Sequence, residues 1–337
     1  MRVGLVGYGD AGRGIHAPLI ARAGSQVSAV QTSRPDRVAA VRADLPDATV
    51  VGSLGDLLET EPDVVVLASP SGVHAEQALQ CIAGGVPVVV DKPLATDAAS
   101  ARAVVDAAER AGVPLTVFQN RRWDGEHLVL TRLLAEGVLG DVFRLERRWE
   151  RWRPVPKNRW RENAPPAEGG GLLLDLHTHL VDSAVQLLGP VTAVYAELAS
   201  RTTPSEDDAF LACTHASGAR SHLGALSLSA APGPRTRVLG TEAAYVATSF
   251  EAEPTAFADL ADLDDDHTGW LVRGDRRSPV PREPGHHADF YVRVAEALAS
   301  GQGQAGMPVQ PGDAVHVLDV LDAARVSDAE RRVVHMP

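Results

Sequence analysis

Short apolar runs alternate with helical patterns through the first third of the chain. The run at 64–68, Val-Val-Val-Leu-Ala, is apolar at every position, which is typical of a strand covered on both faces. Similar runs predict strands at 2–7, 26–32, 64–69, 86–90 and 114–119, with a short one near 49–51. Helical patterns lie between them at 13–23, 35–43, 53–59, 74–84 and 97–111. This alternation predicts a parallel, doubly wound sheet with helices on both faces.

The pattern changes after residue 120. One helix is expected at 126–136, and longer strand-like runs follow at 142–152 and 191–247 with few helices between them. Two late helices are expected at about 288–299 and 312–327, and the Pro-, Arg- and Gly-rich segment 153–171 is expected to be a long loop. We therefore expect an α/β protein of two domains. Residues 1–120 form the parallel-sheet domain, and residues 121–337 form an α+β domain with a large, open, mainly antiparallel sheet.

Composition narrows the class of protein. The 337 residues include 32 Lys and Arg against 44 Asp and Glu, a net charge of −12, which argues against a nucleic-acid partner. No stretch of about 18 residues is free of charge, and the chain runs from Met1 straight into a strand pattern. We therefore expect neither a membrane span nor a secretion signal, and a cytoplasmic protein. Cys81 and Cys213 are expected to be buried free thiols in a reducing compartment.

A glycine motif opens the first helix. The sequence Gly7-Tyr8-Gly9-Asp10-Ala11-Gly12 matches G-x-G-x-x-G directly after the first strand. In this motif Gly7 permits the tight turn, Gly9 lets the backbone approach a pyrophosphate, and Gly12 lets the helix pack closely on the strand. The free N–H groups at the start of the helix, from Asp10 and Ala11 onward, favour phosphate. The motif predicts a Rossmann domain that binds a dinucleotide; a tight turn without a ligand is the alternative.

The end of the second strand bears on the choice between NADP and NAD. An NAD site places Asp or Glu there to hold the ribose hydroxyls, but the chain has Thr32 and Ser33, followed by Arg34 and Arg37. An arginine can pair with the 2′-phosphate of NADP. We therefore expect NADP as the cofactor, with NAD possible. The alternative is that Arg34 is a solvated loop residue.

Two segments carry candidate reaction chemistry. Lys92 follows the strand at 86–90, and the carboxyl ends of parallel strands are where ligands bind. On a helix over 172–188, at about 100° per residue, five polar residues form one stripe: Asp175, His179, Asp182, Ser183 and Gln186. Such a stripe suits a polar cleft, with Asp175 and His179 close enough to interact. A surface lysine and a structural Asp–His contact are the alternatives.

Taken together, these motifs resemble the Gfo/Idh/MocA oxidoreductase family over nearly the whole chain. The matching segments are Gly7–Gly12, Ser69–His74, Asp91–Pro93, Asn120–Asp124 and Gly169–Asp182. The resemblance implies a Rossmann domain, a C-terminal α/β domain with a large open sheet, and hydride transfer between NAD(P) and a sugar or cyclitol. The Asn-Arg-Arg-Trp-Asp run, and Asp rather than Glu before Lys92, resemble the branch that contains NADP-dependent scyllo-inositol dehydrogenases.

The resemblance also implies roles for particular residues. Lys92 donates to the reacting oxygen, His179 exchanges the hydroxyl proton, and Asp175 orients His179. Further cofactor contacts are implied for Ser69, Pro70, Ser71, His74, Asp91, Lys92 and Asn120. Substrate contacts are implied for Arg121, Arg122 and Trp123 together with Lys92, Asp175 and His179. A homodimer or homotetramer is expected.

The chain departs from the family pattern at three places. The family usually has Asn at the position of Ser71, a small residue at the position of His177, and often Tyr near His287. The first departure bears on contacts to the nicotinamide ribose, and the other two bear on the substrate.

Several other patterns have ordinary explanations. His177 and His179 are about 200° apart on a helix and cannot share one metal ion, and the Asp262–Asp266 acidic run lacks the spacing of a calcium loop. We expect no metal. The Arg- and Trp-rich stretch 147–153, with Trp160, is expected to border the active site or a subunit interface rather than to bind nucleic acid.

Three alternative functions remain open at the level of sequence. They are NAD-dependent glycosidase chemistry on the same site, a non-catalytic regulator that senses a dinucleotide, and reduction of a non-sugar carbonyl or imine. Net turnover of reduced nicotinamide separates the first from a dehydrogenase. A sensor needs no proton relay, so Lys92, Asp175 and His179 argue against the second.

Overall fold

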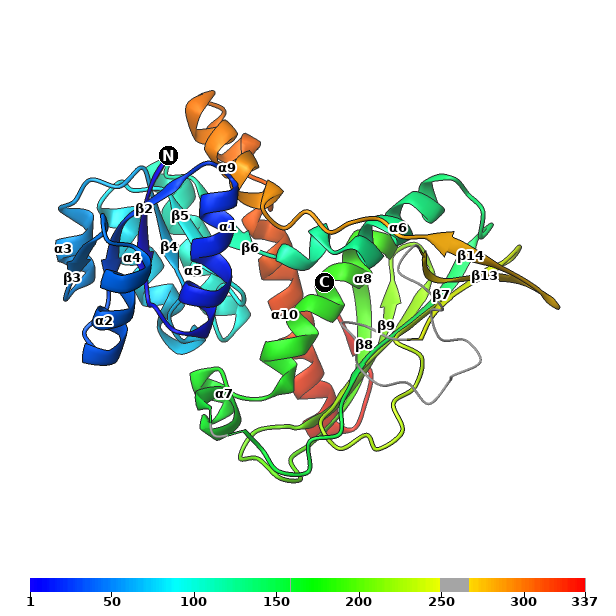
Figure 1. Ribbon diagram of the computed structural model, residues 1–337. Coiled ribbons are helices and arrows are strands. Elements are labelled where there is room, and N and C mark those ends of the chain that lie inside the picture. The colour runs from blue at the N-terminus through cyan, green and yellow to red at the C-terminus, as the bar shows by residue number, and fades with distance from the viewer. Residues whose placement is uncertain (158, 249–266, 337) are drawn as a thin grey trace. The chain divides into compact units, whose positions relative to one another are not determined.

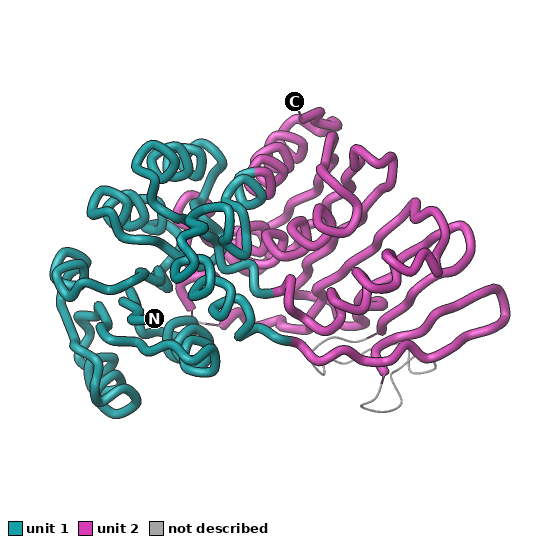
Figure 2. The backbone as a smooth tube through the Cα atoms, turned by 90° about the horizontal axis from the view of Figure 1, so that it is seen from above, with its two compact units in different colours: residues 1–120, 286–315 teal, residues 121–285, 316–337 magenta. Residues whose placement is uncertain are grey.

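The computed structural model describes residues 1–157, 159–248 and 267–336, and the chain divides into two compact units. Unit 1 comprises residues 1–120 and 286–315, and unit 2 comprises residues 121–285 and 316–337 (Figure 2). The first division between the two units falls after residue 120, where the sequence predicted the domain boundary. The expectation that all of 121–337 forms the second domain needs correction, because residues 286–315 return to unit 1. The reason is aromatic packing: the rings of Phe290 and Tyr291 lie 4.9 and 5.7 Å from the ring of Phe118.

Unit 1 contains a six-stranded parallel sheet in the order β3-β2-β1-β4-β5-β6. Its strands are β1 (Arg2–Val6), β2 (Gln26–Gln31), β3 (Thr49–Val51), β4 (Val64–Leu67), β5 (Val88–Asp91) and β6 (Leu115–Phe118). All six coincide with the predicted runs, because β4, β5 and β6 are buried along their whole length. This strand order is that of a Rossmann fold, with the switch point between β1 and β4.

Helices flank this sheet (Figure 1). They are η1 (Gly12–His16), α1 (Ala17–Arg22), α2 (Pro35–Asp44), α3 (Leu54–Leu58), η2 (Ser71–Val73), α4 (His74–Ala83), α5 (Ala98–Ala111), α9 (Asp289–Ala299), η7 (Gly303–Gly306) and the first residues of α10 (Pro311–Glu330). The ends of α3 and α5 follow local rules. Ser53 and Asp56 form a capping box at the start of α3, and Gly112 ends α5 in the left-handed conformation.

Unit 2 contains a nine-stranded sheet in the order β14-β13-β12-β11-β7-β10-β9-β8-β15. The strands are β7 (Val142–Glu150), β8 (Val191–Ala199), β9 (Asp208–His215), β10 (Arg220–Leu226), β11 (Thr236–Gly240), β12 (Ala244–Ala247), β13 (His267–Arg273), β14 (Arg276–Pro281) and β15 (Val334–His335). Among the described strand pairs, β7 with β10 is parallel and the others are antiparallel. The expected fold class is therefore confirmed. Strands β13 and β14 were not expected, since the mostly exposed β14 has no apolar alternation.

The helices of unit 2 include the one that carries the candidate catalytic residues. They are η3 (Asn120–Trp123, whose first residue belongs to unit 1), α6 (Gly125–Ala135), α7 (Trp160–Asn163), η4 (Pro166–Glu168), η5 (Leu173–His177), α8 (Thr178–Leu188) and most of α10. The expected helix over 172–188 begins as a π-turn, η5, and becomes α-helical at Thr178. A wheel drawn at 100° per residue does not hold through a π-turn. The expected loop 153–171 contains the short elements α7 and η4.

Cys81 and Cys213 are buried free thiols, as expected. Burial raises the pKa of each to about 12, so both stay protonated at neutral pH and serve as small packing groups. No helix within the described residues is long and apolar enough to cross a membrane.

The burial of His177 makes the fold sensitive to acid. His177 is fully buried, with Nε2 3.3 Å from the Leu223 carbonyl oxygen, and burial lowers its pKa from 6.5 to about 4. As the pH falls, the imidazole of the unfolded chain takes up a proton before the buried imidazole of the folded protein does. The contribution of His177 to the free energy of unfolding is therefore complete above about pH 6.5 and is lost between pH 6.5 and 4. The loss at pH 5 is about 2 kcal/mol. The free energy of unfolding, measured with urea, should therefore fall less between pH 7.5 and pH 5.0 in His177→Gln than in the wild type.

The exposed His335 provides the matched control, because it is a histidine on the surface of the same unit. His335→Gln should leave the pH dependence of unfolding unchanged. If His177→Gln kept the full pH dependence of the wild type, the buried neutral imidazole would not be its source.

Candidate active site

The glycine turn after β1 is packed so tightly that side chains are excluded. Gly7 has φ +90°, and a Cβ there would lie 2.8 Å from the Ala68 carbonyl oxygen. A Cβ on Gly12 would lie 2.1 Å from the Gly7 carbonyl oxygen. The turn lies beside the switch point between β1 and β4, at the carboxyl edge of the sheet. Bare backbone at this place, followed by a helix start, is a cradle for phosphate groups.

A pocket beside this turn contains three arginines. It is lined by Tyr8, Gly9, Asp10, Arg13, Gly14, Arg34, Asp36, Arg37 and Ala40. Arg34 donates two hydrogen bonds to Asp36, at 3.1 and 2.9 Å. The guanidinium of Arg37 lies 3.3 Å from the Cβ position of Gly9 and has no side-chain partner among the residues described. The arginine that faces the glycine turn is therefore Arg37, whereas the sequence pointed first to Arg34.

Lys92 follows β5 at the same carboxyl edge as the glycine turn, because β1, β4 and β5 are parallel neighbours. It is partly exposed. Its backbone N–H donates to Asp91 Oδ1 at 2.8 Å. His74 lies 2.8 Å from the Pro93 carbonyl oxygen through Nδ1 and 2.9 Å from the Ser69 carbonyl oxygen through Nε2. His74 thereby joins the loop after β4 to the segment after Lys92.

This geometry alters the expected cofactor contacts. The ring nitrogens of His74 both face backbone carbonyls, and the Asp91 carboxylate faces protein groups, so the polar side-chain atoms of both residues are engaged within the protein. Ser71 is buried in η2, and the Ser69 hydroxyl donates to Gln77 at 2.6 Å. The remaining expected positions differ in exposure: Pro70 and Ser33 are exposed, Asn120 is half-buried and Thr32 is buried.

In unit 2, Asp175 lies in η5 and lines a pocket. Its carboxylate is 3.4 Å from Nε of Arg161. Trp149, Arg151, Arg153, Leu172 and Thr203 are among the other residues that line this pocket. The sequence did not single out Arg161, because it lies in the segment 153–171, which was expected to be a long loop. An ion pair with Arg161 favours the ionised form of Asp175.

His179 lies one helical turn beyond Asp175 and is 9% exposed. Its ring centroid is 6.0 Å from that of Trp149. Three guanidinium groups contact the same indole, those of Arg121 and Arg151 at 5.1 Å and that of Arg235 at 4.7 Å. The imidazole therefore packs on an aromatic platform that cation–π contacts hold in a fixed orientation.

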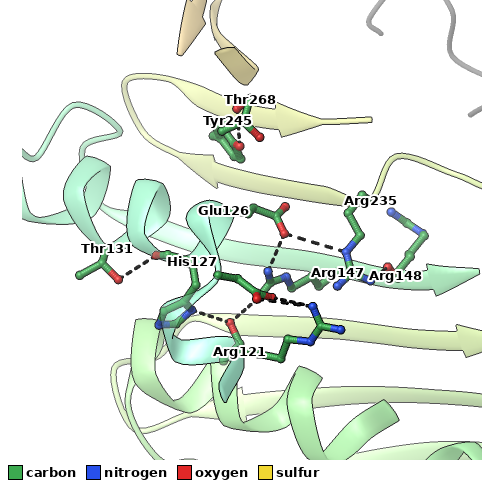
Figure 3. Close-up of polar contacts among 11 residues, drawn as sticks. Arg121, Glu126, His127, Thr131, Arg147, Arg148, Arg235, Tyr245 and Thr268 are labelled. Carbon is green, nitrogen blue, oxygen red and sulfur yellow. Dashed lines mark hydrogen bonds and ion pairs between the residues drawn. The ribbon is translucent and has the colours of Figure 1, made fainter. Parts of the chain in front are cut away.

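Arg235 connects this platform to a buried ionic network. Figure 3 draws Glu126, Arg147 and Arg235 of that network. Glu126 accepts from Arg147 at 2.6 Å and lies 3.9 Å from Arg235. Burial alone would raise the pKa of Glu126, but the charges of these two arginines more than offset it and hold the pKa below its usual value. Arg147 also donates to Ser183, which lies 3.0 Å from Nδ1 of His127.

The network corrects the expectation of a polar cleft along the whole helix. Asp182 and Ser183 are 2% and 3% exposed, and Asp182 accepts two hydrogen bonds from Arg122, at 3.0 and 2.6 Å. Arg122 was expected to contact substrate. In the structure its guanidinium binds Asp182 of α8. The sequence could not show this pairing, because the arginines come from segments distant in the chain. Only the Asp175–His179 end of the stripe is left as candidate chemistry.

Within the described residues, no group of three or more His, Cys, Asp or Glu side chains is placed to hold a metal ion. His177 and His179 are both buried, and His177 faces the sheet through the Leu223 carbonyl. The acidic run Asp262–Asp266 lies outside the described residues.

Comparison with known proteins agrees with this geometry. Residues 1–119 match the model of an oxidoreductase family with an NAD-binding Rossmann fold, and residues 127–246 match the GFO/IDH/MocA C-terminal domain. The scyllo-inositol 2-dehydrogenase (NADP(+)) IolW of Bacillus subtilis is 30% identical over 99% of this chain and 95% of its own length. The chain belongs to the Gfo/Idh/MocA oxidoreductase family.

Two further proteins are similar over nearly their whole length. The uncharacterized oxidoreductase YdgJ of Escherichia coli is 34% identical over 96% of this chain and 94% of its own length. The structure of the putative oxidoreductase yvaA from Bacillus subtilis superposes with a TM-score of 0.88 at 29% identity, covering 100% of this chain and 98% of that one. The chain is thus an oxidoreductase with an NAD-binding Rossmann fold, and the glycine cradle is the part of unit 1 that fits a nicotinamide dinucleotide.

Gly12 provides a direct test of that cradle. Gly12→Ala places a methyl group against the Gly7 carbonyl oxygen and forces the turn to open, so the affinity for nicotinamide dinucleotide should fall about 10-fold or more. Gly14→Ala is the matched control, because a Cβ at Gly14 meets nothing within 4 Å. Dissociation constants from quenching of protein fluorescence by NADPH measure both. Equal affinities for the two variants would contradict the cradle.

Proposed function

We propose that this protein is an NADP-dependent dehydrogenase that acts on a hydroxyl-bearing carbon of a sugar or cyclitol. The observation that carries the proposal is the position of Lys92, a cation at the carboxyl end of β5, on the same sheet edge as the glycine cradle. Similarity to a scyllo-inositol 2-dehydrogenase over the whole chain favours a polyol substrate.

The chain's own residues take three roles in this proposal. The nicotinamide, when bound, supplies or accepts a hydride. The Lys92 ammonium donates a hydrogen bond to the reacting oxygen and stabilises negative charge that develops on it. His179 takes up or returns the hydroxyl proton through its imidazole, and Asp175 orients that ring. The Trp149 platform keeps His179 in one orientation for both directions of the reaction.

The preference for NADP is proposed from the charges beside the glycine turn. Asp36 is the one acid close to the end of β2, and Arg34 neutralises it through two hydrogen bonds. Arg37 faces Gly9 and is placed to pair with a 2′-phosphate, as a charge-assisted and bidentate contact. The exposed Ser33 hydroxyl can add a further donor. Asp36, engaged by Arg34 in this way, is not free to hold the two ribose hydroxyls of NAD.

A substrate panel tests the proposed function. Cyclitols, including scyllo-inositol, and aldoses are incubated with the protein and either NADP or NAD, and absorbance of the reduced nicotinamide is followed. Oxidation of at least one polyol with net reduction of NADP is expected. Conversion of a substrate without net change in nicotinamide would indicate glycosidase-type chemistry. Cofactor binding without turnover of any substrate, in either direction, would indicate a sensor.

Lys92→Met should abolish most of the turnover and leave cofactor binding nearly unchanged. Methionine keeps the length of the side chain but cannot donate a hydrogen bond to the reacting oxygen, and loss of one such donor costs about 10²–10³-fold in kcat. The dissociation constant for NADPH should stay within a few-fold of the wild type. Turnover within a few-fold of the wild type would remove Lys92 from the mechanism.

Arg37→Ser should reduce the preference for NADP over NAD in binding affinity. Loss of a charged hydrogen-bond pair of about 1.5–3 kcal/mol corresponds to roughly 10-fold or more in NADP affinity, while NAD affinity should hardly change. Arg34→Ser should also weaken NADP binding, because it leaves the Asp36 charge uncompensated. Titration of both cofactors into each variant measures this.

The exposed Arg42 on the same helix is the control for net charge. Arg42→Ser should leave both affinities unchanged. A wild-type protein that bound NAD as tightly as NADP would refute the proposed cofactor choice.

A further inference from the structure

His16 is a buried titratable residue that the proposed mechanism does not use. It closes the π-turn η1, directly after the glycine turn, and has no exposed surface. Its Nδ1 lies 2.6 Å from the Tyr291 hydroxyl oxygen, and its ring centroid lies 4.5 Å from that of Phe118. All three residues belong to unit 1. A π-turn of this kind often marks a functional position in a helix.

The other ring nitrogen of His16 faces the segment that carries Lys92. His16 Nε2 lies 3.6 Å from Asp91 Oδ2, and Asp91 Oδ1 accepts the backbone N–H of Lys92 at 2.8 Å. Polar groups thus follow one another from Tyr291 through His16 and Asp91 to Lys92, and the step between His16 and Asp91 is slightly longer than a hydrogen bond. This series connects the helix that follows the phosphate cradle with the end of β5.

The chemistry of each group fixes where the protons lie. Burial raises the pKa of Tyr291 well above 10, so its hydroxyl stays protonated and can donate to His16 Nδ1. An ionised carboxylate only accepts hydrogen bonds. With the Tyr291 hydroxyl donating to Nδ1, the hydrogen of a neutral His16 lies on Nε2, on the side of Asp91.

Asp91 is held as an anion by the groups around it. Burial alone would raise its pKa, but the nearby imidazole of His16, followed by Lys92 and His74, more than offsets this and keeps the pKa below its usual value. Tyr291 is the remaining titratable group that these residues face. His16 makes the largest of the favourable contributions.

We propose that His16 is a positioning residue, which keeps the Asp91 carboxylate ionised and thereby fixes the Lys92 segment at the edge of the sheet. The inference rests on the proposed role of Lys92. When Asp91 takes up a proton, the acceptor for the Lys92 backbone N–H weakens and the negative charge beside the Lys92 ammonium disappears. The hydrogen-bond donor to the reacting oxygen is then no longer held in place.

The chain's small number of lysines allows this inference to be tested without turnover. Lys92 and Lys157 are the two lysines in the sequence. Protein labelled with [15N]lysine therefore gives two backbone amide signals, and Lys157→Arg identifies the one from Lys92. Because the Lys92 N–H donates to Asp91, its chemical shift should follow the ionisation of Asp91 as the pH is varied in cofactor-free protein.

Two substitutions of His16 separate its two nitrogens. Gln is long enough to return an N–H donor near the position of Nε2, whereas Asn reaches only the position of Nδ1. His16→Asn should move the midpoint of the Lys92 amide titration upward by about one pH unit or more. His16→Gln should restore part of this shift. Tyr291→Phe, which removes only the partner of Nδ1, should have a smaller effect in the same direction.

The rate should change in a pH-dependent way. In His16→Asn, kcat should fall about 10-fold near the acid limb of the pH profile and recover toward the wild-type value at higher pH, where Asp91 is ionised again. NADPH affinity should remain within a few-fold. An equal loss of kcat at every pH, or an unshifted Lys92 amide titration, would overturn the positioning role.

Lys92→Met distinguishes this failure from failure of the proposed function. If Lys92→Met retains turnover, the role of Lys92 is wrong whatever His16 does to the titration. If Lys92→Met is inactive while His16→Asn leaves both titration and pH profile unchanged, the proposed function stands and only the inference about His16 fails.

Discussion

The contact between Gly12 and the Gly7 carbonyl is the constraint on which the rest of unit 1 depends. No side chain fits at Gly12, so the first helix lies directly against the end of β1. That close approach exposes bare backbone to a phosphate, and it also sets where η1 runs and where His16 points. The same packing that makes a cofactor cradle therefore places a buried imidazole against Asp91. Binding and chemistry at this edge of the sheet have one structural origin.

Buried charge is handled differently in the two units. Unit 2 pairs several of its buried carboxylates with arginine, as Glu126 with Arg147 and Asp182 with Arg122. Such pairs contribute little net stability relative to apolar packing, but removing one partner leaves an uncompensated charge and is costly. In unit 1, Asp91 relies on neutral or titratable partners and a backbone N–H. The arginine pairs suit a rigid scaffold, whereas the Asp91 surroundings respond to protons.

Much of the fold follows from local sequence signals. The six strands of unit 1 follow from largely apolar runs, and the glycine turn and the position of Lys92 follow from spacing alone. The Asp175–His179 helix was located correctly, but its wheel assumed a regular α-helix where the chain forms a π-turn. Asp182 and Ser183 were consequently assigned to a cleft, although long-range arginine partners bury them. His16 was not anticipated because its partner Tyr291 lies 275 residues away, and no local pattern predicts such a pairing.

The return of residues 286–315 to unit 1 has a consequence for biosynthesis. The ring of Phe118 packs against Phe290 and Tyr291, so the first 120 residues leave the ribosome without the aromatic groups that cover one end of their sheet. The interval from residue 120 to residue 315 is 315 − 120 = 195 residues, which takes roughly 10 to 40 s at ordinary rates of translation. During that interval a sheet whose Phe118 lacks the cover of Phe290 and Tyr291 is present in the cell. The nascent protein therefore passes through a stage at which chaperone binding competes with misassembly, and a gene fragment that encodes residues 1–120 alone would yield that stage as its final product.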